Sequence, residues 1–259
     1  MLLKEKLKNR ELTIGSWITI GHPAIPEILA QAGFEWLVID IEHTTIDLAM
    51  VQILISTIQA QGIAALVRVS KNEEVVIKRV LDSGADGIIV PMVNTVEDAQ
   101  KAVAFAKYPP EGKRGVGLAR AQQYGAGFDS YKLWVKEKLI VIAQIEHIDA
   151  VNNLEEIIKV KGIDGTIIGP YDLSGSLGIP GEYNDLKVVK ALDRYKITCR
   201  NSNMSMGYHV IDPNYQSLKE KINEGYNFIA FSTDFLFMGT KSNQEMEKKN
   251  ISIAHDKGL

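Results

Sequence analysis

The sequence predicts a (β/α)8 barrel, the TIM-barrel fold, built as a single domain. Eight short apolar runs rich in β-branched residues alternate with longer amphipathic segments, which is the pattern of repeated βα units. Each run is nearly continuous in apolar residues, as expected of parallel strands covered on both faces. The chain has 259 residues, which matches the usual size of such a barrel. A doubly wound sheet would interrupt this alternation at a switch point, and the sequence shows no interruption.

The predicted elements follow one another in a regular order. The eight predicted strands read TIGSWIT, WLVIDIE, AALVRVS, GIIVPM, LIVIAQIE, GTIIGP, SMGYHV and FIAFSTD. Helical patterns that mostly end at glycine or before proline span residues 24–32, 47–61, 72–83, 96–107, 150–160, 185–201 and 214–223. We expect residues 1–259 to form one domain, with a short helix at the start and a helical tail over 236–259. The connection 108–135 is long, basic and rich in glycine, and long connections are often functional or disordered.

Composition excludes several classes of protein. A net charge of -3 gives no reason to expect nucleic acid or an anionic membrane as a partner. The single cysteine, Cys199, excludes an intrachain disulfide and fits a reducing compartment. No apolar run is long enough to span a bilayer, and the charged N-terminus lacks the apolar centre of a signal peptide. We therefore expect a cytoplasmic protein.

Polar residues gather at the predicted strand ends. They are Asp40, Glu42 and His43 after the second strand, Arg68 after the third, Gln144 and Glu146 after the fifth, and Tyr171 and Asp172 after the sixth. The C-terminal strand ends of a (β/α)8 barrel carry its chemistry. Charged groups beside apolar strands cost several kcal/mol to desolvate unless they are paired or bound to metal. This placement therefore predicts a functional site.

Two carboxylates on adjacent strands predict a metal site. Glu146 and Asp172 would repel each other unless a cation lies between them. Oxygen ligands without a nearby cysteine favour Mg²⁺ or Mn²⁺, with Co²⁺ also possible. The alternative is that each carboxylate pairs with an arginine or caps a helix, and Asp172 stands where it could be an N-cap.

Arg68 and His43 each have two interpretations. Arg68 could form a salt bridge with Asp40 or Glu42, or it could place a fixed positive charge near a developing enolate oxygen. His43 could be an exposed loop residue, or it could serve in acid–base catalysis with Asp82 or Asp40 orienting its ring. Asp82 lies at a predicted helix end, where a capping or surface role is equally open.

Two further features concern binding. In the segment GPYDLSGSLG, the amides of Tyr171 and Asp172 would open a short helix, and a helix N-terminus is a natural seat for a carboxylate. His209 ends the seventh strand, where it could line the pocket, although packing in the core is the stronger expectation.

The same residues carry a resemblance to the HpcH/HpaI aldolase family of metal-dependent pyruvate aldolases. The similarity runs from about Gly15 to about Gly239, through AGFEWLVIDIEH, LVRVS, GADGIIVPMVNT, YPPEGKRGVG, QIE and GPYDLSGSLG. It implies a carbon–carbon lyase that cleaves a 4-hydroxy-2-oxo acid into pyruvate and an aldehyde. It also implies a homohexamer with exchanged C-terminal helices, in which neighbouring subunits help to build each site.

The resemblance assigns roles to the polar residues. Glu146 and Asp172 would bind the metal, and Arg68 would bind the 2-oxo oxygen and stabilise the pyruvate enolate. Gln144 would contact the carbonyl or a metal-bound water, and the Tyr171 and Asp172 amides would hold the pyruvate carboxylate. The remaining role, proton transfer, would fall to His43, supported by Asp82 or Asp40.

This chain departs from the family pattern near the expected aldehyde side. Ile41 stands where the family has glycine, the loop GVGLARAQ is shorter, and His209 stands where small or aliphatic residues are commoner. The pyruvate half of the site is intact, whereas the acceptor aldehyde is open.

Three rival functions remain at this level. A Schiff-base aldolase needs a buried lysine, for which Lys71 is the nearest candidate. Another metal-enolate lyase, such as an oxaloacetate decarboxylase or a citrate-lyase-like enzyme, would use the same residues. A non-catalytic binder of small molecules would not need the whole set.

Overall fold

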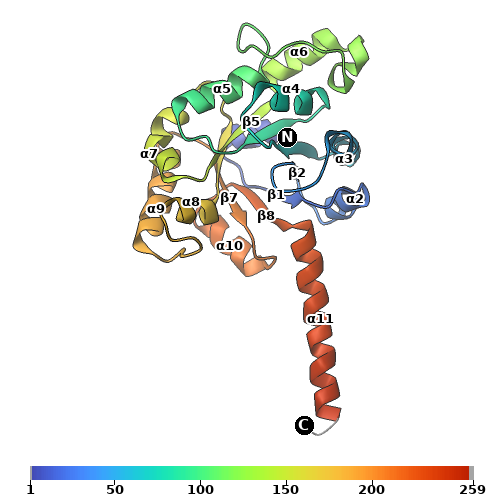
Figure 1. Ribbon diagram of the computed structural model, residues 1–259, viewed down its shortest axis with the longest axis vertical. Helices are drawn as coiled ribbons and strands as arrows, with labels where there is room; N and C mark the ends of the chain where they lie inside the picture. Colours follow the sequence, from blue (N-terminus) through green and yellow to red (C-terminus); the bar gives the residue numbers. More distant parts are fainter. Residues whose placement is uncertain (1, 257–259) are drawn as a thin grey trace.

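The computed structural model describes residues 2–256 and shows a closed barrel of eight parallel strands in sequence order. Each strand pairs with its neighbours along the chain, and β8 pairs with β1 to close the barrel. The strands are β1 (Thr13–Ile18), β2 (Trp36–Asp40), β3 (Ala64–Arg68), β4 (Gly87–Val90), β5 (Ile140–Ile145), β6 (Gly165–Ile168), β7 (Met206–Val210) and β8 (Phe228–Thr233). The predicted fold class is confirmed (Figure 1).

Helices surround the barrel (Figure 1). Those before the long connection are α1 (Leu3–Asn9), α2 (Ala24–Gln31), α3 (Leu48–Ala60), α4 (Glu74–Asp82) and α5 (Val96–Ala106). Those after it are α7 (Ile148–Ile157), α8 (Pro170–Ser176), α9 (Leu186–Asn201), α10 (Tyr215–Asn223) and α11 (Asp234–Asp256). Every predicted helix is present, and each predicted boundary within residues 2–256 lies within three residues of the observed one, whereas the end of the predicted tail at residue 259 lies outside the described residues.

The long connection is more ordered than its composition suggested. It contains a 3-10 segment, η1 (Arg120–Gly125), and a helix, α6 (Phe128–Glu137). Tyr131 and Val135 are the buried residues of α6. The N-cap of the helix is Gly127, which has no side chain to accept a hydrogen bond from the first free amides.

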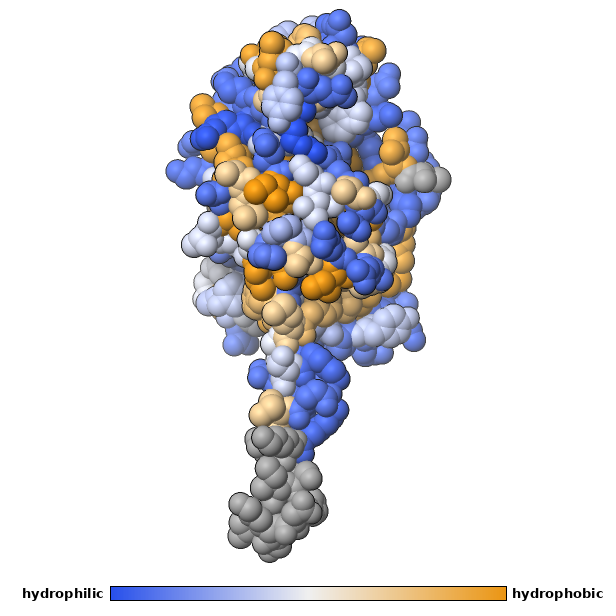
Figure 2. Space-filling view, turned by 90° about the vertical axis from the view of Figure 1, so that its right-hand side faces the viewer, coloured by the Kyte–Doolittle hydropathy of each residue, from blue (hydrophilic) through white to orange (hydrophobic). Residues whose placement is uncertain are grey.

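The last helix, α11, leaves the body of the molecule (Figure 1). Its first residue, Asp234, is buried and accepts hydrogen bonds from the amides of Thr19 and Ile20, both at 2.8 Å. This ties the end of β8 to the end of β1. Figure 2 shows apolar side chains gathered around the point from which the helix emerges, and Phe235 and Met238 are exposed on it. Within residues 2–256, no helix is long and apolar enough to cross a membrane.

The barrel interior is closed at its N-terminal end by α1. Leu3 and Leu7 of α1 belong to the same buried cluster as the side chains inside the barrel. In that cluster Trp36 stacks on Phe228 with ring centroids 4.2 Å apart. Gly15 makes room for this pair, because a Cβ there would lie 2.1 Å from the Trp36 ring.

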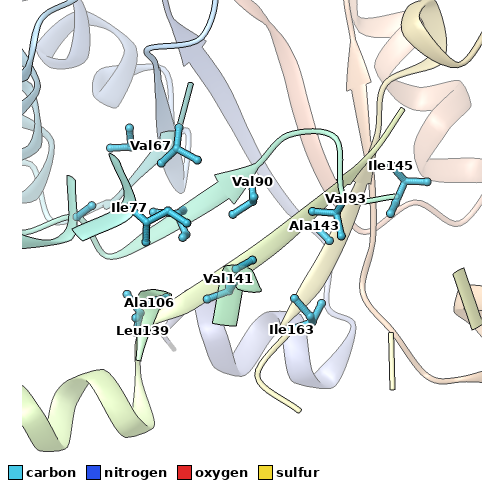
Figure 3. Close-up of a cluster of buried hydrophobic side chains, with 14 of the residues drawn as sticks. Val67, Ile77, Val90, Val93, Ala106, Leu139, Val141, Ala143, Ile145 and Ile163 are labelled. Atoms are coloured by element: carbon cyan, nitrogen blue, oxygen red, sulfur yellow. The ribbon is translucent and has the colours of Figure 1, made fainter. Parts of the chain in front are cut away.

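A second and larger core joins the outside of the barrel to the helices (Figure 3). Figure 3 shows Val90, Val141 and Ala143 on the strands, facing apolar side chains that come from the surrounding layer. Burial of both faces accounts for the continuous apolar runs in the sequence. The two buried clusters fix the positions of the strand ends, which carry the polar residues at the C-terminal mouth.

Candidate active site

Of the polar residues predicted at the strand ends, Arg68, Gln144, Tyr171 and Asp172 line a small cavity at the C-terminal mouth of the barrel. Asp40 and Glu146 do not line it but are hydrogen-bonded to Arg68 and Gln144. The cavity has a volume of about 90 Å³. Among its lining residues are Trp17 of β1, Arg68 of β3, Gln144 of β5, Gly169 and Asp172 after β6, and His209 of β7. Residues from five strand ends therefore converge on one space, as chemistry in this fold requires.

Glu146 and Asp172 face a common space across Gly169. A Cβ built on Gly169 would lie 3.6 Å from Oε2 of Glu146 and 3.6 Å from Oδ2 of Asp172. One oxygen of each carboxylate therefore lies close to Gly169. Asp172 is not a helix cap, because the N-cap of α8 is Gly169 and Asp172 lies two residues inside the helix.

Glu146 is buried and firmly oriented. Its Oε1 accepts a hydrogen bond of 2.6 Å from the amide of Met92, and its Oε2 accepts one from the side-chain amide of Gln144. Burial raises the pKa of Glu146, and the charge of Asp172 raises it further, against the opposing effects of these hydrogen bonds and of Arg68. A cation between the carboxylates would offset both the free-energy cost of burying their charges and the repulsion between them.

The surroundings fit a cation held mainly by oxygen. Oε1 of Gln144 is buried and has no hydrogen-bond partner among the described residues, so a further polar oxygen borders the pair. Within the described part of the chain, no three His, Cys, Asp or Glu side chains come close enough to hold a metal by themselves. Two carboxylates would leave most coordination positions to water and substrate.

Arg68 lies between Asp40 and the cavity. Its Nε and Nη2 donate to the two carboxylate oxygens of Asp40 at 2.9 and 2.7 Å, and Nε lies 3.3 Å from Oε2 of Glu42. The guanidinium carbon also lies 4.5 Å from the ring centroid of Trp17. Burial alone would raise the pKa of Asp40, but the hydrogen bonds and charge of Arg68 hold it below its ordinary value. The salt bridge predicted for Arg68 is present, and Arg68 nevertheless lines the cavity.

His43 stands at the rim, with its side chain 71% exposed. Its Nε2 lies 3.8 Å from Oε2 of Glu42, and its backbone amide donates to Asp40 at 3.4 Å. Burial raises the pKa of Glu42 to about 7, with Glu146 and Asp172 among the charges that add to this effect and Arg68 opposing it. The rim therefore holds a carboxyl group that gains or loses its proton near neutral pH, next to the histidine.

Asp82 is not brought to the site within one chain. It ends α4, and its Oδ1 accepts hydrogen bonds from Arg114 at 2.5 Å and from Gln122 at 3.2 Å. These partners belong to the long connection, which α4 helps to anchor. In one chain Asp40, rather than Asp82, contacts the His43 segment.

Lys71 does not fit a Schiff-base aldolase. Its side chain is 72% exposed, and its ammonium lies 3.9 Å from Oε1 of Glu73. An amine that attacks a carbonyl needs a pKa lowered by burial or by nearby positive charge. Neither is present at this surface position.

Sequence reasoning missed contributions made by the backbone. Met92 has φ of 52°, in the left-handed region that non-glycine residues seldom adopt, and this conformation accompanies the amide contact to Glu146. Ser232 on β8 has φ of 52° as well, next to an irregularity in the pairing of β1 with β8. Backbone donors and acceptors have no residue signature, whereas Trp17 could have been found from its place near a strand end.

Comparison with known proteins decides the family. The family model described as HpcH/HpaI aldolase/citrate lyase matches residues 13–238. The chain belongs to the HpcH/HpaI aldolase/citrate lyase family. The resemblance predicted from the sequence motifs is thereby confirmed, as is the prediction of a carbon–carbon lyase.

Members of the HpcH/HpaI family match nearly the whole chain. The 2-keto-3-deoxy-L-rhamnonate aldolase of Salmonella typhi is 35% identical over 89% of this chain and 86% of its own. A solved HpcH/HpaI aldolase/citrate lyase family protein from Burkholderia cenocepacia J2315 has a TM-score of 0.91 and 30% identity, covering 96% of this chain and 98% of that one. The solved citrate synthase SbnG has a TM-score of 0.83 and 26% identity, covering 97% and 99%.

Proposed function

We propose that this chain is a metal-dependent aldolase that cleaves a 4-hydroxy-2-oxo acid into pyruvate and an aldehyde. The observation that carries the proposal is that Glu146 and Asp172 both have an oxygen close to Gly169, with Asp172 lining the cavity beside Arg68 and Glu146 bonded to the lining residue Gln144. Membership of the HpcH/HpaI family supports it.

Glu146 and Asp172 would hold a divalent cation, either Mg²⁺ or Mn²⁺, with Co²⁺ also suited to the oxygen ligands. When bound, such a cation polarises the oxo group of the substrate and lowers the energy of negative charge on its oxygen. Gln144 holds Glu146 in place through its amide nitrogen, and its oxygen Oε1, which has no partner among the described residues, would accept a hydrogen bond from a donor bound beside Glu146.

The chain's own residues would orient the oxo acid. Pro170 is the first residue of α8, so the amides of Tyr171 and Asp172 lie in its first turn, where a helix leaves N–H groups free for a carboxylate. Arg68 would place positive charge at the oxo oxygen and stabilise the enolate left when the bond between carbons three and four breaks. Asp40 fixes the guanidinium through two hydrogen bonds, which supports this role.

Proton transfer is assigned to the rim. His43 would take the proton of the 4-hydroxyl group as that bond breaks, and it is exposed and close to Glu42. Asp40 would support it by holding its backbone. The proposed help of Asp82 would have to come from a neighbouring subunit, since in its own chain that side chain binds Arg114.

The substrate class follows from relatives and from size. The relatives named 2-keto-3-deoxy-L-rhamnonate aldolase act on a 2-oxo sugar acid. The cavity of about 90 Å³ is well below the roughly 300–1,000 Å³ of pockets for drug-sized ligands. A cavity of this size would hold the three-carbon oxo acid, while a small aldehyde would lie at the open rim.

A second candidate shares the same enolate chemistry, namely a lyase acting on oxaloacetate or on a citrate-like acid. The similarity to the citrate synthase SbnG favours keeping it, because citrate synthesis also forms a carbon–carbon bond.

We also propose that the protein is a homohexamer in which α11 is exchanged between subunits. The helix extends away from the barrel (Figure 1), and Phe235 and Met238 near its start are exposed in the single chain. A helix with exposed apolar groups is stabilised by packing against a neighbour.

The test is a screen of pyruvate release from 4-hydroxy-2-oxo acids of different length and charge, with and without added Mg²⁺ or Mn²⁺. Release that needs the metal and is insensitive to borohydride supports the aldolase. Turnover of oxaloacetate alone would support the second candidate. Activity that survives a chelator and is lost on borohydride treatment with pyruvate would overturn the metal-dependent mechanism.

A further inference from the structure

A cavity outside the barrel is larger than the one at the mouth and has no part in the proposed reaction. Its volume is about 430 Å³, within the roughly 300–1,000 Å³ of pockets for small molecules. It is bordered by α3, η1, α6 and the turn between α4 and β4, and its lining includes Gln59, Asp86, Arg120 and Trp134. Asp86 immediately precedes β4, so the cavity lies toward the N-terminal end of the barrel, away from the mouth.

The cavity is lined by one carboxylate and one guanidinium that are held by the same neutral side chain. Nε2 of Gln59 donates to both carboxylate oxygens of Asp86 at 3.2 Å, and its Oε1 accepts a hydrogen bond of 2.9 Å from Nη2 of Arg120. The other partners of the two charged groups are also neutral, namely the amide of Ala65 and the carbonyl of Ser83. Among the described residues, neither Asp86 nor Arg120 forms a salt bridge.

Both charged groups keep hydrogen-bonding capacity for a ligand. A guanidinium has five N–H donors, and Arg120 uses one on Gln59 and one on Ser83. Burial raises the pKa of Asp86, against the opposing effects of its hydrogen bonds and of the charge of Arg120. An ammonium group at Asp86 and a carboxylate at Arg120 would offset the cost of burying these charges among neutral partners.

An aromatic surface completes the lining. Trp134 on α6 is partly exposed, whereas the other two tryptophans, Trp17 and Trp36, are buried. The ring of Trp134 stacks on that of Tyr131, with centroids 5.6 Å apart and planes inclined by 11°. Both rings line the cavity, so a flat aromatic group that enters would pack against them.

We propose that this cavity binds the zwitterion of an aromatic α-amino acid, with its ammonium group at Asp86, its carboxylate at Arg120 and its ring on Trp134. An α-amino acid carries both charged groups on one carbon atom, which suits two charged side chains held by the two ends of a single amide. A ligand with only one charge would leave Asp86 or Arg120 with neutral partners. Because the site lies away from the mouth, the proposal does not depend on the aldolase function.

The first test compares L-phenylalanine with two analogues by isothermal titration. One analogue, 2-phenylethylamine, lacks the carboxylate, and the other, 3-phenylpropionate, lacks the ammonium group. We expect phenylalanine to bind about tenfold more tightly than either, because each analogue loses a charge-assisted hydrogen bond. Equal affinity for all three, or no binding of phenylalanine at millimolar concentration, would overturn the proposal.

The second test locates the two charged groups of the ligand. Asp86→Ala should weaken phenylalanine about tenfold and leave 3-phenylpropionate unchanged, whereas Arg120→Gln should weaken phenylalanine as much and leave 2-phenylethylamine unchanged. Asp129→Ala on α6, where the side chain is 95% exposed, is the matched control and should bind as the wild type does. Wild-type affinity for phenylalanine in either site variant would overturn the assignment.

A third variant decides if the substitutions of charged residues prevent folding. Trp134→Leu removes an indole ring that is partly exposed, and it should lower the preference for phenylalanine over alanine about tenfold. An unchanged preference would mean that the ring of the amino acid does not lie on Trp134 and would overturn the proposal.

Discussion

At the scale of single residues, Arg68 both forms an ion pair with Asp40 and lines the cavity. Its hydrogen bonds to Asp40 use Nε and Nη2. A guanidinium has five N–H donors, so others remain for a ligand. The two interpretations that the sequence left open are therefore compatible, and the ion pair is what gives the arginine a fixed direction.

Replacing Glu146 by glutamine should abolish metal-dependent pyruvate release while leaving the barrel folded. The loss should exceed the roughly 100-fold that removal of a supporting partner of a metal ligand costs, because a ligand itself is removed. Steady-state assays and Mn²⁺ titration measure the two effects. Glu155→Gln on α7, where the side chain is 72% exposed, is the matched control. Full activity in the Glu146 variant would exclude that residue from the site.

Replacing Arg68 by lysine should lower kcat/KM by about 10²–10³, the range seen when one stabilising donor is lost from a transition state. A point charge does not reproduce the two-pronged contact with Asp40. Arg79→Lys on exposed α4 surface serves as the control. Near-normal turnover in the Arg68 variant would mean that Arg68 only forms a structural ion pair with Asp40 and takes no part in catalysis.

Replacing Glu42 by glutamine should stabilise the metal-free protein increasingly as pH rises. The native pKa of about 7 lies above the ordinary 4.5, so the folded state favours the protonated form. The stability that Glu42 contributes is complete below about pH 4.5 and is lost as pH rises through about 7. Urea midpoints of both proteins between pH 4.5 and 8 measure this. A difference that is independent of pH would contradict it.

At the scale of elements, the turn from β6 into α8 sets the spacing of the carboxylates. Gly169 is the N-cap of α8, and Asp172 follows within the first turn of that helix. Glu146 comes from the end of the neighbouring β5. The predicted short helix is confirmed. Its N-cap, Gly169, also lies close to an oxygen of each carboxylate, which the capping position alone would not show.

Replacing Gly169 by alanine should weaken cation binding by about tenfold or more without unfolding the chain. The added Cβ would lie 3.2 Å from Cβ of Glu146 and 3.6 Å from one oxygen of each carboxylate, so Glu146 would have to shift away from Gly169. Isothermal titration with Mn²⁺ measures the affinity. Gly175→Ala in the same helix adds a methyl group with no described atom within 4 Å and should leave binding unchanged. Equal affinity in both variants would place the cation elsewhere.

At the scale of the whole molecule, ending the chain after Gly239 should dissociate the proposed hexamer into smaller species. The change removes most of α11 but keeps the anchor of Asp234 on Thr19 and Ile20, so each barrel should stay folded. Light scattering after gel filtration gives the mass, and circular dichroism checks the fold. A truncated chain with the mass of the full-length assembly would exclude exchange of this helix.

Much of this architecture is predictable from the sequence because buried segments consist of apolar residue types, which can be recognised directly. Each of the eight apolar runs forms a strand. A polar residue at the end of such a run is therefore expected at the C-terminal mouth of the barrel. What escapes prediction depends on tertiary contact. Asp82 was expected near His43, yet it binds Arg114 from a connection whose path the sequence does not show. His209 was expected to pack, with lining the pocket as the alternative, and it does both, since its ring lies 5.3 Å from that of Trp17 and it borders the cavity.

The seal that α1 forms beneath the barrel bears on the order of events in catalysis. With Leu3 and Leu7 filling the floor, reactants and products share the opening on the opposite side. In the proposed aldolase, the aldehyde would be released toward that opening and depart first, and pyruvate, held deeper against β5 and β6, would follow it. Pyruvate should then compete with the hydroxy-oxo acid for free enzyme, while the aldehyde should not.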